Sequence, residues 1–229
     1  ALEFACIFAG LGVYTTVVYR GKEILREFDE DLRKNLHEEM EAKGIRVLTE
    51  TNLEKVTKDA DGWLNVSLAN GETHQVSQVM LALGRIPLTE NLGLEVAGVE
   101  TDSKGAIVVD DFSRTNVPNI LAVGDVTNRV QLTPVAIHEA MCLIETEFKD
   151  NPTKPDHNLI PTAVFTQPEL GTVGLPEHVA TERYAKLAIY RAKFRPMKYT
   201  LPKRESFQIM KLIVTEETDN VDGAHILGP

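Results

Sequence analysis

Runs of apolar residues along the first third of the chain predict a helix, a strand, a second helix and a second strand. Residues 1–9 are apolar nearly all round, as in a buried helix, and the run 13–19 is rich in β-branched residues, as in a strand. Asp29 is suited to cap the second helix, on which large apolar side chains recur every four positions: Leu32, Leu36 and Met40. Because the run 45–50 reads as another strand, we expect right-handed crossovers and a parallel sheet.

The pattern changes to alternation in the next part of the chain. Residues 64–68 alternate apolar with polar side chains between turn signals at 61–62 and 70–71, which predicts a small antiparallel meander. Residues 76–84 then form an apolar run that predicts a buried strand, broken at Gly84.

Two further apolar runs, 105–110 and 119–125, predict strands that precede a long helix. Thr133 followed by Pro134 is a strong helix start with Thr133 as the N-cap, and the apolar pattern continues to about Phe148. Beyond a polar, proline-bearing linker, a last set of runs predicts an antiparallel sheet: residues 162–165, 171–174, 186–194, 207–215 and 224–227.

These patterns divide the chain into three units, with boundaries at 1–95, 96–155 and 156–229. The first unit is α/β with an inserted antiparallel meander, the second consists of strands followed by a helix, and the third is α+β with an antiparallel sheet, so the overall fold class is α/β. The chain opens in the middle of a helical pattern without a cap and stops as a strand finishes, so we expect both ends to be cuts in a longer protein.

Composition narrows the function classes. A formal charge of 24 − 34 = −10 argues against nonspecific nucleic-acid binding, so an anion site must come from a local cluster of cations. No run of some 18 apolar residues occurs, and the sequence predicts no membrane span. Cys6 and Cys142 lie far apart on expected helices without a redox partner, which favours two buried free thiols in a cytoplasmic protein.

Arg20 and Arg26 follow the strand that would end a dinucleotide-binding βαβ unit. One interpretation is a pair of exposed loop arginines with weak surface partners among Glu23, Glu27 and Asp29. The other is functional, because an acid at this position bonds the ribose diol of NAD, whereas arginine accommodates the 2′-phosphate of NADP. The second interpretation predicts a preference for NADPH over NADH.

Gly124 and Asp125 end an apolar strand shortly before the helix start at Thr133. Acids at such strand ends lie where α/β folds bind ligands, and a helix N-terminus presents unpaired N–H groups to an anionic group. The alternative is an ordinary turn and a capped helix. Gly84 also has two interpretations. It either ends the preceding strand in an ordinary turn, or it lacks a side chain because a dinucleotide lies against the backbone there.

Glu3 is a carboxylate in an otherwise apolar helix. It either faces solvent or pairs with a cation outside this chain, because a buried, unpaired carboxylate is costly.

Several stretches together resemble the glutathione reductases, which are FAD-dependent pyridine nucleotide–disulfide oxidoreductases of class I. They are "LALGRIP", "GAIVVDDFSRTNVPNILAVGDVTNRVQLTPVAIHEA", "PTKPDHNLIPTAVFTQPELGTVGL" and "KFRPMKYTL". The resemblance covers nearly the whole chain and implies a Rossmann-like NADPH-binding domain over 1–95, a FAD-contacting segment over 96–155 and a partial dimerisation domain over 156–229.

The resemblance also implies a role for each matching residue. Arg20 and Arg26 would hold the 2′-phosphate of NADPH. Three residues would line the rest of the NADPH site: Gly84, Gln131 and Val164. Three would contact FAD: Asp125, Leu132 and Thr133. Glu3 would form a supporting ion pair near the flavin with an upstream lysine.

The same resemblance implies that the redox-active cysteine pair and the acid–base histidine lie outside this chain. No catalytic residue is therefore expected within it, and the chain alone should be inactive. The parent enzyme would be a homodimer that reduces glutathione disulfide, with trypanothione, thioredoxin and mercuric reductases as alternatives. A hypothesis from another class is a non-catalytic nucleotide-binding module.

Overall fold

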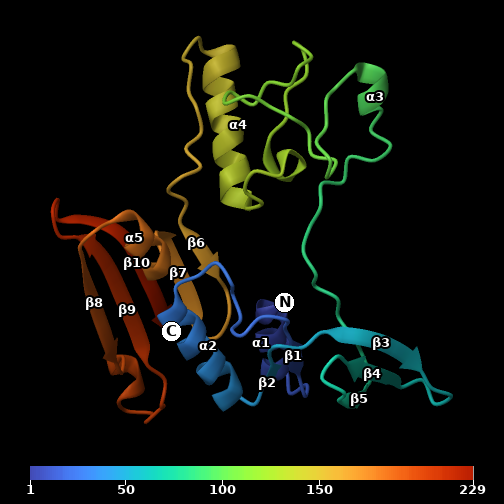
Figure 1. The fold of residues 1–229 in the computed structure, drawn as a ribbon, viewed down its shortest axis with the longest axis vertical. Coiled ribbons are helices and arrows are strands. Elements are labelled where there is room, and N and C mark those ends of the chain that lie inside the picture. The colour runs from blue at the N-terminus through green and yellow to red at the C-terminus, as the bar shows by residue number, and fades with distance from the viewer. Residues whose placement is uncertain (229) are drawn as a thin grey trace. The chain divides into compact units, whose positions relative to one another are not determined.

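The computed structural model describes residues 1–228 (Figure 1). The chain divides into two compact units, each described by itself. Unit 1 comprises residues 1–82 and 161–229, and unit 2 comprises residues 83–160.

Unit 1 begins with the alternation of helix and strand that the sequence predicts. Helix α1 (Leu2–Gly10) precedes β1 (Thr16–Val18), and helix α2 (Glu30–Ala42) precedes β2 (Arg46–Leu48). The two strands pair in parallel, with Val17 opposite Val47, as predicted.

Helix α2 follows the predicted pattern closely. Asp29 is its N-cap, and its side chain accepts a hydrogen bond from the Asp31 N–H at 3.0 Å. The three predicted apolar positions are fully buried: Leu32, Leu36 and Met40. They join a core with residues of the five-stranded sheet, among them Leu170, Ile209 and Leu227.

The predicted meander is confirmed as a three-stranded antiparallel sheet. It consists of β3 (Leu53–Lys58), β4 (Leu64–Leu68) and β5 (Thr73–Val76) in that spatial order. Val66 and Leu68 are its buried side chains.

The rest of unit 1 is the predicted antiparallel sheet, now with five strands. They are β6 (Thr162–Val164), β7 (Glu169–Gly174), β8 (Leu187–Phe194), β9 (Gln208–Thr215) and β10 (Asn220–Gly228). The spatial order is β6-β7-β10-β9-β8, with every neighbouring pair antiparallel. The sequence analysis did not predict helix α5 (Glu177–Arg183) or the 3₁₀ turn η2 (Met197–Tyr199).

Unit 2 contains α3 (Leu94–Ala97), the 3₁₀ turn η1 (Gly124–Thr127) and the long helix α4 (Thr133–Phe148). The prediction of a helix ending at Phe148 is confirmed, but the prediction of Thr133 as N-cap is wrong. The Leu132 carbonyl accepts bonds from the Val135 and Ala136 N–H groups, so Leu132 is the cap and Thr133 already belongs to the helix.

Three predicted strands are not formed. The runs 105–110 and 119–125 contain only isolated bridges, Thr101 with Ile107 and Arg114 with Leu121. Of the run 76–84, only Val76 belongs to a strand, and Met80, Leu81 and Leu83 are 53–89% exposed. A strand requires a neighbour that takes its N–H and C=O groups, and apart from Val76, which pairs with Leu64 of β4, no residue of these runs belongs to a strand ladder within residues 1–228.

Candidate functional site

Arg20 and Arg26 lie on the loop between β1 and α2. Arg20 is exposed, and no ion pair joins it to another residue in the described part of the chain. Arg26 has one acidic partner, Glu27, at 3.2 Å, and the two side chains are 67% and 81% exposed. An exposed pair of this kind is worth little, so an anion can compete with Glu27 for the Arg26 guanidinium.

The other acids near this loop are engaged away from the two arginines. Glu23 contacts His37 Nδ1 at 2.8 Å, and Asp29 binds the buried Lys211 ammonium at 2.8 Å. Of the three surface partners considered for the arginines, only Glu27 is therefore realised. The loop presents cationic side chains without a full set of neutralising acids.

Helix α2 anchors the backbone of the loop at two residues before Arg26. Arg33 donates from Nε to the Ile24 carbonyl and from a terminal nitrogen to the Glu23 carbonyl, both at 2.7 Å. Ile24 itself is 1% exposed and belongs to the core. The loop thus combines a backbone anchored at Glu23 and Ile24 with exposed arginine side chains.

Glu3 on α1 lies beside the end of strand β6. Its Oε1 accepts a hydrogen bond from the Phe165 N–H at 2.8 Å, directly after Val164. Val164 is partly buried against the core of unit 1. The structure therefore brings together Glu3 and Val164, two candidate site residues that are distant in sequence, and no cation within residues 1–228 pairs with Glu3.

The turn η1 in unit 2 depends on Gly124. Its φ is +75°, and a Cβ atom there would lie 3.1 Å from the Ala136 Cβ on α4. Asp125 follows with a 45% exposed side chain, and its Oδ2 lies 3.8 Å from Arg85 Nε. The sequence analysis did not select Arg85, although it stands next to Gly84 in the quoted "LALGRIP" stretch.

The remaining candidates of unit 2 surround the start of α4. The Gln131 amide donates to Asn128 Oδ1 at 2.9 Å, which holds it at the end of η1. Thr133 is exposed in the first turn of the 16-residue helix, where N–H groups have no intrahelical acceptor. Gly84 is also exposed, has a φ of +124° and has open space around its Cβ position.

Glu139 is the residue that organises this turn, and the sequence analysis missed it. It is 1% exposed on α4, and its Oε2 accepts the Gly124 N–H at 2.6 Å. Its Oε1 contacts His157 Nε2 at 2.7 Å and an Arg129 terminal nitrogen at 3.1 Å. The available signal was a carboxylate within the apolar part of a helix, similar to the signal that drew attention to Glu3.

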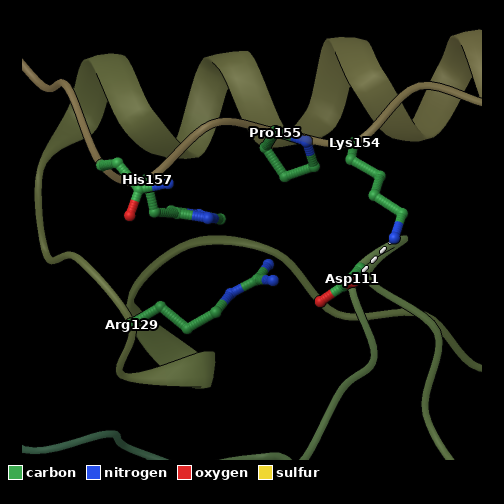
Figure 2. A pocket seen from close by; sticks show the side chains of 6 residues that line it. Asp111, Arg129, Lys154, Pro155 and His157 are labelled. Atoms are coloured by element: carbon green, nitrogen blue, oxygen red, sulfur yellow. Dashed lines mark hydrogen bonds and ion pairs between the residues drawn. The ribbon is translucent and has the colours of Figure 1, made fainter.

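Arg129 and His157 also line a cavity of about 230 Å³ together with Asp111, Lys154, Pro155 and Asn158 (Figure 2). The basic groups face acids within the same cluster, because Lys154 pairs with Asp111 at 2.7 Å while Arg129 and His157 pair with Glu139. Arg129 Nε is buried and has no hydrogen-bond partner within residues 1–228. Because these basic groups are neutralised by neighbouring acids, the cluster is better suited to join the linker to η1 than to bind a charged ligand.

Both cysteines are buried and free, as predicted. Burial raises the pKa of the Cys142 thiol, which disfavours the reactive thiolate. Among residues 1–228, no helix has the length and apolar character needed to cross a membrane.

Comparison with known families and proteins places these features in context. The family model described as pyridine nucleotide-disulphide oxidoreductase matches residues 1–140, and the model of its dimerisation domain matches residues 160–229. The whole chain is similar to a glutathione reductase from Burkholderia cepacia with 44% identity and to the chloroplastic/mitochondrial glutathione reductase of Pisum sativum with 47%. A trypanothione reductase from Leishmania donovani is 44% identical over the whole chain.

The chain spans about half the length of the curated relatives that it matches, 51%, 41% and 47% for these three. Among solved structures, it is similar to the HOCl-induced flavoprotein disulfide reductase RclA from Escherichia coli. The TM-score is 0.91 at 25% identity, and the match covers 99% of this chain and 52% of RclA.

Proposed function

This chain belongs to the pyridine nucleotide-disulphide oxidoreductase family, and from that premise we propose that the complete protein reduces glutathione disulfide with NADPH. Electrons would pass from NADPH through FAD and a redox-active disulfide to the substrate. The identities of 44–47% to relatives named glutathione reductase support this substrate.

The arginine loop is the observation that carries the choice of nucleotide. Arg20 and Arg26 stand where an acid would bond the ribose diol of NADH, and an acid there would repel a 2′-phosphate. Planar guanidinium groups bond phosphate oxygens with favourable geometry and charge. Because Glu23 and Asp29 are engaged elsewhere, the loop supports binding of the 2′-phosphate by both arginines.

The rest of the nucleotide and flavin site is proposed on the same basis. FAD supplies a ring system that accepts a hydride from NADPH and passes electrons on to a disulfide. Asp125 would bond a hydroxyl of the flavin side chain, and Thr133 would place its backbone N–H near the flavin ring. Leu132, whose N–H donates to the Val130 carbonyl at 3.0 Å, would contact the flavin through its other atoms. Gly84, Gln131 and Val164 would line the nicotinamide nucleotide.

Glu3 would support the flavin region through an ion pair with a cation elsewhere in the complete protein. The bond from the Phe165 N–H uses Glu3 Oε1 and leaves Oε2 available for such a partner. The homodimeric state, the cytoplasmic location and the domain boundaries 1–95, 96–155 and 156–229 also belong to the proposal. The match to a dimerisation domain over residues 160–229 supports the dimer.

The test of the nucleotide assignment is Arg20→Glu combined with Arg26→Ala in the complete protein. Two charge-assisted bonds of about 1.5–3 kcal/mol each correspond to a loss of roughly 10²–10⁴-fold in kcat/KM for NADPH. The value for NADH should change little. Arg183→Ala on α5, which removes an exposed arginine outside the loop, should leave both values unchanged. An unchanged NADPH/NADH ratio in the double variant would contradict the assignment.

Trypanothione disulfide is a second candidate substrate, because trypanothione reductases are 42–44% identical over the whole chain. Steady-state kinetics of the complete protein with glutathione disulfide and with trypanothione disulfide separate the two. A higher kcat/KM for trypanothione disulfide would replace the first candidate. Binding of NADPH without reduction of either disulfide would favour a non-catalytic nucleotide-binding protein.

A further inference from the structure

Lys211 on β9 is a fully buried cation in contact with three carboxylates. Its side chain is 2% exposed, and its ammonium lies 2.8 Å from Asp29, 2.6 Å from Asp31 and 2.6 Å from Glu177. Arg191 on β8 joins the same cluster through Asp31 at 2.8 Å. The cluster therefore connects the start of α2 with the antiparallel sheet that matches the dimerisation domain.

The charge of Lys211 is maintained by its partners. Burial lowers the pKa of Lys211, but the hydrogen bonds to Asp29, Asp31 and Glu177 outweigh burial and raise it above its ordinary value. Buried ion pairs contribute little net stability relative to apolar residues of similar volume, whereas loss of one partner is strongly destabilising. Such a cluster is better suited to fix a geometry than to add stability.

The geometry that Lys211 fixes is the end of the arginine loop. Both oxygens of Asp29 are engaged: Oδ1 binds Lys211 and the Asp31 N–H, and Oδ2 accepts the Glu177 N–H at 3.0 Å. Asp29 ends the loop and stands three residues after Arg26. Its position is thus set by contacts from β9 and α5, both distant in sequence.

From these contacts we infer that Lys211 is a positioning residue for Arg26, through which the dimerisation domain contributes to the selectivity for NADPH over NADH. This inference rests on the proposed role of the arginine loop. It assigns a role in nucleotide selection to a side chain that touches no part of that loop except its last residue.

Arg20 provides an internal comparison. Its neighbours are held by the parallel sheet, because the Tyr19 N–H donates to the Leu48 carbonyl at 2.8 Å and the Glu50 N–H donates to the Gly21 carbonyl at 3.0 Å. These bonds do not involve Asp29 or Lys211. Removal of Lys211 should therefore displace Arg26 and leave Arg20 in place.

The experiment measures dissociation constants of NADPH and NADH for the complete protein carrying Lys211→Met. A companion variant, Lys211→Met with Asp29→Asn, leaves no unpaired charge at Asp29 and keeps a residue able to cap α2, so that at least one of the two folds. We expect roughly a tenfold weaker affinity for NADPH, as for the loss of one charge-assisted bond, with NADH affinity and kcat at saturating NADPH unchanged. Lys193→Met on β8 removes an exposed lysine that binds Asn35 at 3.0 Å and lies over the Phe207 ring, away from Asp29, and it should change neither affinity.

Combining Lys211→Met with single arginine variants shows which arginine carries the loss of NADPH affinity. The loss from Lys211→Met should largely disappear in an Arg26→Ala background and persist in an Arg20→Ala background. Wild-type NADPH affinity in the folded lysine variants, or an equal loss for both nucleotides, would overturn the inference. If Arg20→Glu with Arg26→Ala also leaves NADPH affinity unchanged, the proposed function of the loop fails; if only the lysine variants have no effect, the role of Lys211 alone fails.

Discussion

Replacement of Glu139 by glutamine tests whether one buried carboxylate holds the turn that carries Asp125. Glu139 is 1% exposed, and its two oxygens serve different partners. Oε2 accepts the Gly124 N–H, and Oε1 faces Arg129 and His157. Glutamine has nearly the same shape but only one accepting oxygen, so one side of this arrangement must lose its acceptor.

The loss of stability can be worked out for each orientation of the glutamine amide. If the amide oxygen faces Gly124, the amide nitrogen faces Arg129, and a charge-assisted bond worth about 1.5–3 kcal/mol disappears. If the amide is reversed, the buried Gly124 N–H is left unsatisfied at a cost of about 1–3 kcal/mol. Either orientation predicts a loss of about 2 kcal/mol, or a decrease in Tm of roughly 4–8 °C for a chain of this size.

Thermal unfolding and amide hydrogen exchange together provide the assay. If the amide is reversed, the Gly124 amide should exchange roughly 10–100-fold faster in the Glu139→Gln variant, since each 1.4 kcal/mol corresponds to a factor of ten. If the amide oxygen keeps the Gly124 bond, exchange at Gly124 should stay near that of the wild type. Glu145→Gln on the same helix is the matched control. It weakens only partly exposed contacts, an ion pair with Lys149 at 2.6 Å and a bond from the Asn151 amide at 3.2 Å, so Tm and Gly124 exchange should remain near those of the wild type.

Equal Tm values for the two variants would refute this reasoning. Unchanged exchange at Gly124 with a lowered Tm would assign the loss to the side of Arg129 and His157.

Two further predictions concern buried positions. Burial lowers the pKa of His225 below its ordinary value of 6.5 despite the bond to the Leu175 carbonyl, so the unfolded chain takes up the proton first. The free energy of unfolding should therefore fall as pH drops below about 6.5, and denaturant titrations of a His225→Asn variant should show a smaller fall over that window. Gly124→Ala and Gly44→Ala should each cost about 1–2 kcal/mol through their positive φ. Gly124→Ala should cost about 1 kcal/mol more in denaturant unfolding, because its Cβ would lie 3.1 Å from Ala136 whereas Gly44 has open space; equal losses would contradict the close approach.

The elements predicted best are those whose pattern and local signals agree. Helix α2 has an apolar repeat, a capping aspartate and a terminal glycine, and its four-residue repeat alone identifies the buried face. The antiparallel strands after residue 160 were predicted from apolar runs bounded by turn residues, and five of them form one sheet. Local sequence was sufficient in both cases.

The failures share a cause, which is dependence on a partner. The runs 76–84, 105–110 and 119–125 have the apolar content of strands, but a strand exists only if a neighbour completes its hydrogen bonds. Thr133 was assigned as a cap from residue type, whereas the actual cap is defined by the Leu132 carbonyl. No local pattern records either fact.

In the candidate site, too, local signals identified some residues, while those that depend on distant partners were missed. Motif and position selected Arg20, Arg26 and Asp125, but the residues that hold them were missed. Lys211 lies on the same face of β9 as Ile209 and Ile213, because side chains two positions apart point to the same side of a strand. Alternation therefore predicts that Lys211 is buried, whereas its charge predicts that it is exposed. Glu139 could be recognised only as an acid within the apolar part of a helix that also carries Glu145 and Glu147.

The 182 residues that separate Asp29 from Lys211 have a consequence for the order of events on the ribosome. At about 5–20 residues per second, Lys211 is synthesised roughly 10–40 s after Asp29. During that interval Asp29 and the loop before it lack their buried counter-charge, while the whole of unit 2 is being made. The end of the loop that carries Arg26 should therefore reach its final geometry among the last parts of unit 1, and nascent chains stopped before residue 211 should contain α2 without a fixed Arg26.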